Sequence, residues 1–423
     1  MARYRDKIAG RVLMSPADSI APEHVIAYDH IKGPEVTAFP PSALDGFREE
    51  YRVFYSNLYG GFWVFTRFED IRAILQDPDS FGQHAGGLPH NPYPKIHIPL
   101  MLNPPEHGVY RKVMTPIFSP RMIAKLEPLI RDVMRAQVRK IAPLGRCDFV
   151  DDFCMISPST MYCGLLGIDP SNFEEFNRLS LALIFGAADT FEREGEEAAR
   201  KLRQDTSQQI DDILKDVLDD RRKNRGDDLL SILLDGEVYD RKLTDDEMLN
   251  IASLLFFAGT DSTAAIMSYA FLFLAQNPEY QKQLAGNPSI FPAATQELIR
   301  YNGFHQIRRE ARRDVEIAGV TIPKGDIILL PMGAANHDPA KFADPLTVSF
   351  ERGNAGGAMT FSAGPHRCIG QHLATLQLRI ALEEVTAVIP DYRLDPDQPY
   401  ELMTSHAKAV LRHLPMVWTP VDV

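Results

Sequence analysis

The sequence predicts a mostly α-helical protein with a minor β-sheet, folded as a single domain over residues 1–423. A long apolar run from Ile251 to Ala275 predicts a buried helix, which the capping box Thr244-Asp-Asp-Glu247 opens. Two β-branched runs flank the turn residues Pro323-Lys-Gly325 and predict a hairpin within 315–330. Proline and glycine are dispersed and no linker divides the chain, so we expect these elements to share one domain.

The other elements follow in chain order from hydrophobic periodicity and turn signals. A β-prone run covers 61–66, a short helix covers 69–75, and a loop rich in Pro, Gly and His covers 83–105. Helical patterns then cover 106–142, 172–225 and 293–301, and the long apolar helix ends near Asn277-Pro278. A last helix follows Cys368 and continues to Val388, before short strands that complete the chain.

Composition favours a cytoplasmic globular protein that binds neither nucleic acid nor membrane. The net charge of −12 is opposite to the basic surface that general nucleic-acid binding needs. The N-terminus lacks the apolar run of a signal peptide, and Asp261 interrupts the long apolar helix at a depth where a membrane penalises charge. The four cysteines form no CxxC pair, which fits reduced thiols and makes a structural zinc protein the least favoured alternative.

Cys368 lies in the loop Phe361-Ser-Ala-Gly-Pro-His-Arg-Cys368-Ile-Gly370 without a neighbouring cysteine. Gly364 and Gly370 let the backbone turn tightly and approach a flat cofactor. The helix expected after Cys368 favours a thiolate through its amide dipoles. These features suit the single axial thiolate of a haem iron, and the alternative is an inert buried cysteine beside a turn.

The segment Gly259-Thr260-Asp261-Ser262-Thr263 lies in the middle of the apolar helix. Its acid and hydroxyl groups need partners or water in such surroundings. Hydroxyl side chains can bond to carbonyls one turn earlier, and Gly259 permits close approach of a ligand. The segment is either a buried polar kink against a neighbouring helix or a proton relay that serves a reactive centre.

Glu297-Leu-Ile-Arg300 places an acid and a base at i and i+3 on one helix face, where they can pair. Taken alone, this pattern indicates an ordinary surface ion pair.

His107 and Arg111 are one helical turn apart, and Arg is suited to bidentate recognition of a carboxylate. A common ligand with two carboxylates would bring these two residues together with two further cations, Arg309 and His366.

In this order, these motifs resemble those of the cytochromes P450, the haem-thiolate monooxygenases, over nearly the whole chain. The camphor hydroxylase branch of the soluble bacterial class is similar in spacing and in the final stretch Leu414-Pro-Met-Val-Trp418. The motifs that carry the resemblance are Asn103-Pro-Pro-Glu-His107 with Arg111, Ala258-Gly-Thr-Asp-Ser-Thr263, Glu297-Leu-Ile-Arg300, Arg309-Glu-Ala311, Gly319-Val-Thr-Ile-Pro-Lys-Gly325, Ala335-Asn-His-Asp-Pro339, Arg352 and the Cys368 loop.

The resemblance implies a P450 fold with haem b between the long helix and the cysteine loop. It implies that Cys368 is the proximal iron ligand, whose electron donation favours O–O cleavage, and that Asp261 and Ser262 are the acid–alcohol pair, with Thr263 able to share the role. It assigns haem contacts to His107, Arg111, Ala258, Gly259, Arg309, Phe361, His366 and Gly370, and a structural network to Glu297, Arg300 and Arg352. Two positions depart from the family: Ser262 replaces the usual Thr, and Ser362 replaces the usual Gly.

The resemblance also implies a substrate, partners and alternatives. Pocket positions correspond to His97 in the loop with Ile96 and Ile98, and to Leu254, Phe257, His305 and Ala407. The tyrosine that binds the ketone group of camphor in the camphor enzyme has no counterpart in this chain, because Lys95 occupies about that position. We therefore expect a small apolar terpenoid or aromatic substrate other than camphor. A ferredoxin served by a ferredoxin reductase would donate electrons at a basic patch of Arg72, Arg111 and Arg367. A peroxide-driven haem-thiolate oxidase and a non-catalytic haem sensor are the alternatives.

Overall fold

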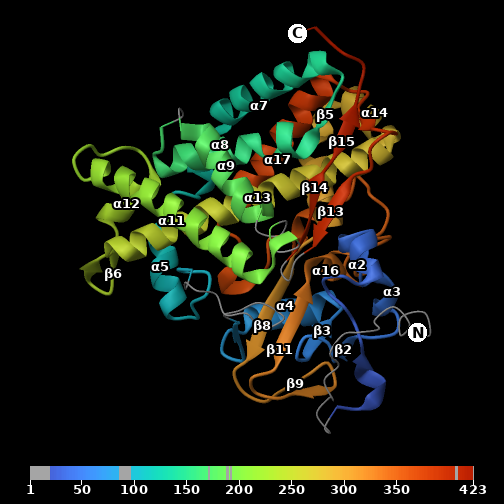
Figure 1. The fold of residues 1–423 in the computed structure, drawn as a ribbon. Coiled ribbons are helices and arrows are strands. Elements are labelled where there is room, and N and C mark those ends of the chain that lie inside the picture. The colour runs from blue at the N-terminus through green and yellow to red at the C-terminus, as the bar shows by residue number, and fades with distance from the viewer. Residues whose placement is uncertain are drawn as a thin grey trace.

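The computed structural model describes residues 20–84, 97–169, 172–186, 190, 193–404 and 408–422. Helices occupy the upper part of the molecule in Figure 1, and the largest sheet lies below them with the N-terminal helices at its side. The helices are α2 Pro34–Ala38, α3 Asp45–Arg48, α4 Phe68–Gln76, α5 Glu106–Met114, α6 Pro120–Ala124, α7 Glu127–Ile141, α8 Ile156–Leu166, α9 Phe173–Leu181, α11 Glu196–Arg221, α12 Leu229–Asp235, α13 Asp245–Gln276, α14 Pro278–Gly286, α15 Phe291–Tyr301, α16 Met332–Asn336 and α17 Gln371–Val388. The prediction of a mostly helical protein with a minor sheet is confirmed.

The largest sheet has six strands in the order β1-β2-β3-β11-β8-β4. Strands β1–β2 and β3–β11 pair in parallel and the other neighbours are antiparallel. Further small sheets have the orders β10-β9, β12-β15-β5, β13-β14 and β6-β7. The strands are β1 Val25–Ile26, β2 Val53–Ser56, β3 Phe62–Phe65, β4 Phe81–Gln83, β5 Arg146–Asp148, β6 Glu237–Val238, β7 Arg241–Lys242, β8 Gln306–Ala311, β9 Val315–Ile317, β10 Val320–Ile322, β11 Ile327–Pro331, β12 Arg393–Leu394, β13 Glu401–Thr404, β14 Ala409–His413 and β15 Pro415–Val417.

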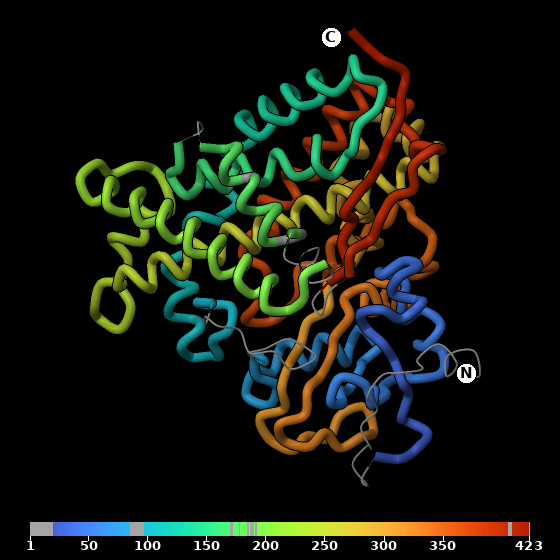
Figure 2. The backbone as a smooth tube through the Cα atoms, in the orientation of Figure 1, coloured from blue at the N-terminus to red at the C-terminus, as the bar shows by residue number. Residues whose placement is uncertain are grey.

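Helix α13 is the central element of the helical part, as the backbone trace in Figure 2 also shows. Thr244 caps its first turn by accepting from the amide of Glu247, and the Glu247 side chain bonds back to Thr244, as the sequence predicted. By length and composition α13 could cross a membrane, but 78% of its most apolar window is buried inside the protein. It is therefore packed as the core helix of a globular protein.

Three local predictions needed correction. The hairpin predicted around Pro323-Lys-Gly325 instead joins β9 to β10, with positive φ at Ala318 and Gly319. Strand β11, which follows the predicted turn, pairs with β8 and β3 in the large sheet, because pairing partners depend on distant residues. The helical pattern over 106–142 is broken into α5, α6 and α7 around prolines that carry no amide hydrogen for the helix.

Candidate active site

One face of α13 opens toward the interior of the protein. Leu254, Phe257, Ala258, Asp261 and Ser262 are spaced at i, i+3, i+4, i+7 and i+8, which places them on a single stripe of the helix. Phe257, Asp261 and Ser262 are partly accessible and Ala258 is exposed, whereas Thr260 and Thr263 on other faces are 1% and 3% exposed. Helix α13 is thus packed along most of its length, and its short accessible face lies at the segment around Asp261 and Ser262, where the sequence predicted either a polar kink or a proton relay.

The hydroxyl groups of this segment bond back along the helix, as predicted. Thr260 Oγ1 donates to the carbonyl of Phe256 at 2.9 Å, and Ser262 Oγ donates to the carbonyl of Ala258 at 2.5 Å. The carboxylate of Asp261 forms an ion pair with Lys408, which directly precedes β14. The sequence analysis did not foresee this partner, because the two residues are far apart in the chain.

Gly259 lies against a side chain that the sequence analysis also missed. A Cβ atom at this position would lie 1.7 Å from Cζ of Tyr162, a buried residue of α8. Burial raises the pKa of Tyr162, and the nearby Cys368 raises it further. Tyr162 therefore reaches from the central helix toward the cysteine loop, and the assignment of Gly259 to cofactor binding stays a prediction.

Cys368 is held in a tightly constrained loop. Its amide donates to the carbonyl of Phe361 at 2.9 Å, which closes the loop before α17 begins. Gly364 adopts φ +69°, and a Cβ there would lie 2.1 Å from the Leu75 carbonyl oxygen, so only glycine fits against α4. Ser362, where the P450 pattern has glycine, adopts φ +63° and carries a backbone strain that glycine would avoid.

The surroundings of Cys368 act on its thiol in two directions. Burial raises the pKa of Cys368, whereas hydrogen bonds from the amides of Gly370 and Gln371 lower it, as do Arg111 and Arg367. Backbone amides at the start of α17 thus favour a thiolate, as the sequence predicted. The cysteine residue is nevertheless accessible, and an accessible thiol surrounded by protein suits a ligand that enters beside it.

Four basic side chains gather beside this loop from three distant parts of the chain. The rings of His107 on α5 and His366 in the cysteine loop have centroids 4.0 Å apart. Arg309 on β8 is 3% exposed, and its Nη1 donates to Gln83 Oε1 at 2.7 Å. Arg111 donates to the carbonyl of Arg367 at 2.5 Å. Among the described residues, none of the four pairs with a carboxylate, and Nε2 of His366 is buried without a hydrogen-bond partner.

The electrostatics of this cationic cluster, defined as His107, Arg111, Arg309 and His366, confirm that its members are mutually close. Burial lowers the pKa of His107 to about 4, with Arg111 and Arg309 adding to the effect. Burial, His107 and both arginines lower the pKa of His366 to about 2. Both imidazoles are therefore neutral at neutral pH, and the positive charge of the cluster belongs to the guanidinium groups of Arg111 and Arg309, which without acidic partners require anions. The donor set therefore fits the two carboxylates of haem, and no carboxylate of the described chain takes their place.

The Glu297–Arg300 pattern turns out to be buried. Both side chains are at most 1% exposed, with Arg300 Nε 2.8 Å from Glu297 Oε2, and Arg352 Nε lies 2.9 Å from Glu297 Oε1. The interpretation as a surface ion pair is therefore wrong. Arg300 also donates to the carbonyl of Asn336, whose side chain binds the amide of Met359 and the hydroxyl of Thr360. The network thus supports the chain that leads to Phe361.

Some of the remaining predicted pocket residues lie on or near α13, and others lie outside the described part of the chain. Leu254 and Phe257 lie on the accessible stripe of α13, and His305 forms an isolated β-bridge with Lys408. The amide of Ile98 donates to the side chain of Asn250 on α13 at 2.7 Å, which brings the segment with His97 near the same helix. Ala407, Lys95 and Ile96 lie outside the described residues, so their predicted roles stay predictions.

The thiol of Cys368 thus lies beside a cluster of basic side chains that have no acidic partner among the described residues, and Asp261 and Ser262 lie on the accessible face of α13. The family profile described as Cytochrome P450 matches residues 164–287 and 290–417, more than half of the chain. The chain therefore belongs to the cytochrome P450 family, and it is a P450 monooxygenase. Membership implies haem as the cofactor.

Relatives and solved structures agree with this assignment. The "Probable cytochrome P450 127A1" of Sinorhizobium fredii is 31% identical over 90% of this chain and 86% of its own length. The "Erythromycin C-12 hydroxylase" of Saccharopolyspora erythraea is 32% identical over 84% of this chain and 89% of its own. The crystal structure of cytochrome P450 CYP101C1 superposes with a TM-score of 0.85 at 29% identity, covering 96% of this chain and all of that one.

Proposed function

We propose that this protein binds haem b through Cys368 and hydroxylates a small organic substrate, using dioxygen and electrons from a ferredoxin. The observation that carries the proposal is the cationic cluster beside the accessible Cys368. Bound haem with a cysteine ligand supplies dioxygen activation. In the overall reaction, one oxygen atom enters a C–H bond and the other leaves as water, consuming two electrons and two protons.

The chain's own residues would hold the cofactor through its propionates and through its iron. His107, Arg111, Arg309 and His366 are proposed to bind the two propionates, because charge-assisted hydrogen bonds from these donors satisfy both partners. The amides of Gly370 and Gln371 favour the charged form of the Cys368 sulfur, against the burial that raises its pKa. The network of Glu297, Arg300 and Arg352 fixes the preceding backbone and is proposed to keep the sulfur in position.

Proton delivery is proposed to use Asp261 and Ser262. The two side chains lie on the accessible stripe of α13, where Ser262 Oγ now donates to Ala258 and Asp261 pairs with Lys408. For transfer, Ser262 Oγ must redirect its proton from the Ala258 carbonyl toward the site, and Asp261 must resupply it. Ser262→Ala is expected to raise the fraction of electrons lost to peroxide, and Ser262→Thr to keep the wild-type coupling of NADH use to product.

The size of the substrate is proposed from the apolar part of the stripe. Leu254, Phe257 and Ala258 line it, which suits a terpenoid or aromatic body. The names of the relatives do not restrict this choice, because they include a mycinamicin IV hydroxylase/epoxidase and a pentalenic acid synthase. A compound that enters the site would shift the Soret band of the oxidised protein, and a screen in which only large compounds or compounds without an apolar body did so would refute this substrate class.

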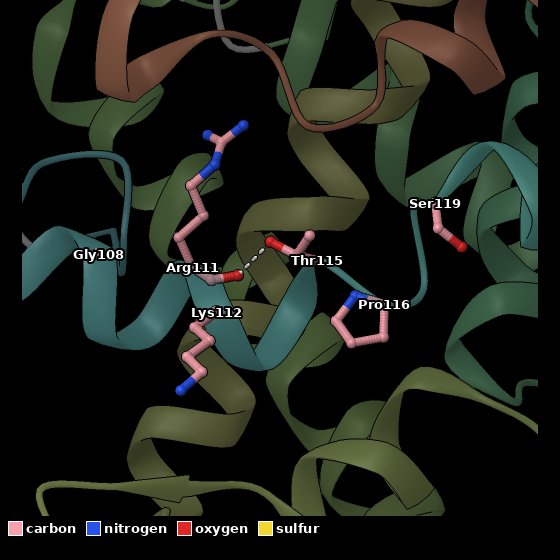
Figure 3. A pocket seen from close by; sticks show the side chains of 6 residues that line it. All are labelled: Gly108, Arg111, Lys112, Thr115, Pro116 and Ser119. Atoms are coloured by element: carbon pink, nitrogen blue, oxygen red, sulfur yellow. Dashed lines mark hydrogen bonds between the residues drawn. The ribbon is translucent and has the colours of Figure 1, made fainter.

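The electron donor is proposed to be an acidic ferredoxin that docks beside the cysteine loop. A surface pocket there is lined by Gly108, Arg111, Lys112, Thr115, Pro116 and Ser119, and Arg111 and Lys112 extend to opposite sides of α5 (Figure 3). A second pocket, which contains Arg367, His372 and Arg379, follows on the other side of the loop. Arg72 is a weaker candidate for this patch than the sequence suggested, because it pairs with Glu69.

Exchange of one exposed charge tests the docking patch. Lys112→Glu is expected to slow reduction by an acidic ferredoxin about tenfold at low salt and to weaken its salt dependence. The matched control is Lys201→Glu on α11, which lies outside both pockets. Equal rates and equal salt dependence in Lys112→Glu and wild type would refute the patch.

The cofactor itself is tested by the absorption spectrum of the reduced protein with carbon monoxide. Thiolate ligation by Cys368 predicts a strongly red-shifted Soret band that Cys368→His abolishes while haem remains bound. Cys163→Ser on α8 serves as the control cysteine and should keep the band. A protein without haem, or with the spectrum of a histidine-ligated globin, would overturn the proposal.

A further inference from the structure

We propose that Lys408 and His305 form an anchoring site for a carboxylate on the substrate, at the polar end of the accessible stripe of α13. The inference rests on the proposed function and makes it more specific: the substrate has a compact apolar body and one anionic oxygen group. The corresponding sequence prediction was a small apolar terpenoid or aromatic substrate, with His97 or His305 as a binding group for a polar handle, and Lys408 was not among the expected pocket residues.

The first observation is the ion pair between Lys408 and Asp261. Their side chains are only 22% and 13% exposed, so the pair is largely removed from bulk solvent. Asp261 belongs to the accessible stripe with Phe257, Ala258 and Ser262, which places the ammonium group of Lys408 at the same interior surface. The polarity of the stripe therefore changes along α13. Leu254 and Phe257 are apolar, and the end at Asp261 carries the ion pair with Lys408.

The second observation is the imidazole beside Lys408. His305 and Lys408 are antiparallel bridge partners, and in such a pair the Cβ atoms lie about 4.5–5.5 Å apart. Nδ1 of His305 is buried and finds no hydrogen-bond partner among the described residues. A hydrocarbon substrate would leave this atom unpaired, whereas an oxygen acceptor would pair with it when Nδ1 carries the proton.

The neutral imidazole beside Lys408 favours an anion over an amine. Burial is the main cause and the positive charge of Lys408 the second cause that together lower the pKa of His305 to about 3, so a second cation next to Lys408 is disfavoured. An ammonium group has three N–H donors, so a substrate carboxylate can share Lys408 with Asp261 or replace Asp261 as its partner. Replacement would release Asp261 for the proton role proposed above, and substrate binding would then prepare the relay.

A matched series of ligands tests the anchor on the holoenzyme. Limonene, perillyl alcohol and perillic acid share one ring skeleton and end in a methyl, a hydroxymethyl and a carboxylate group. Dissociation constants are measured by calorimetry and by the Soret shift at neutral pH. We expect wild type to bind perillic acid at least about tenfold more tightly than limonene, from a charge-assisted hydrogen bond. Octane, 1-octanol and octanoate form a second series for linear substrates.

Variants separate the anchor from general effects of charge. Lys408→Met is expected to remove the preference for the acid while limonene binds as before, and Lys408→Arg to retain most of it. Arg412→Met is the control, because this cation lies on β14, which Lys408 directly precedes, about 13 Å farther along the chain, and pairs with Asp151. His305→Phe should weaken acid binding less than Lys408→Met.

Three results would overturn the proposed anchor. The first is that limonene and octane bind at least as tightly as perillic acid and octanoate. The second is that neither acid binds, and the third is that Lys408→Met still prefers the acids to the hydrocarbons as wild type does. The carbon monoxide spectrum of the same samples separates this failure from failure of the proposed function. An intact red-shifted band with no preference for acids refutes only the anchor, and a missing band in wild type refutes haem-thiolate ligation.

Discussion

Two groups of ionisable residues, both largely removed from solvent, differ in whether the chain itself supplies partners of opposite charge. In the first, the carboxylate of Glu297 receives bonds from Arg300 and Arg352, and both guanidinium groups also donate to backbone carbonyls. In the second, His107, Arg111, Arg309 and His366 face one another without any acid among the described residues.

The difference separates a folding element from a ligand site. A buried ion pair that the chain itself completes stabilises one arrangement of the backbone, here the segment that leads into the cysteine loop. A buried cluster with excess positive charge costs free energy until anions arrive, and part of the binding free energy of the ligand repays that cost. Charge balance in the interior therefore distinguishes the two roles when the residue types are similar.

The largest expected effect is at Glu297. Glu297→Gln leaves two buried guanidinium groups without their carboxylate, so we expect the free energy of unfolding to fall by about 3–5 kcal/mol. Denaturant unfolding of the cofactor-free protein measures the change. The control is Glu351→Gln, an exposed acid on the same connection. A loss as small as in the control would show that the first group is not needed to hold the fold.

Arg309→Leu should not lower the free energy of unfolding of the cofactor-free protein, in contrast to Glu297→Gln. Removal of a buried cation that has no acidic partner is expected to leave stability unchanged or to raise it. Haem affinity is expected to fall about 10- to 100-fold, since a charge-assisted bond to a carboxylate is lost. Transfer of haem to apomyoglobin measures the affinity, with Arg308→Leu on the other face of β8 as the control. If Arg309→Leu destabilised the protein without weakening haem binding, the second group would stabilise the fold as the first does and would not be a ligand site.

The pH dependence of stability provides a third test. The pKa of His107 falls from 6.5 to about 4 on folding, so the unfolded chain takes up a proton first as the pH decreases. The free energy of unfolding of the cofactor-free protein should therefore fall between these two values, by up to about 1.4 kcal/mol per pH unit. His107→Phe should reduce this dependence by the share of one histidine, because His305 and His366 also have lowered pKa values, and His372→Phe at an exposed position should leave it unchanged. Bound propionates would raise the pKa and weaken the effect in the holoprotein.

The smallest expected effect is in the loop itself. Ser362 has φ +63°, so Ser362→Gly should stabilise the protein by about 0.5–1 kcal/mol, after the entropy that glycine costs. Ala358→Gly, at an ordinary φ of −63°, should instead reduce stability. Thermal unfolding of both variants checks the sign. A destabilising Ser362→Gly would mean that the serine side chain compensates for the strain.

Several features were predictable because their signals are local. The capping box at Thr244 and the apolar run gave the course of α13, and the helix after Cys368 extends to Val388 as predicted. The Cys368 loop and the acid–alcohol pair were identified by residue type and order. The partners of β11, the network around Asn336 and the contact of Tyr162 with Gly259 were not, because each depends on residues far apart in the chain.

The sequence by itself determined the course of the long helix α13 and of α17 and singled out the candidate site residues, since capping, periodicity and turn chemistry act over a few neighbouring positions. The tertiary structure decided which charges are buried and what they meet. Glu297 and Arg300 have the same i, i+3 spacing on a surface helix as in a core, and only the chain that covers them makes them a buried network. Likewise, Lys408 became a candidate for substrate recognition only when packing brought it to Asp261.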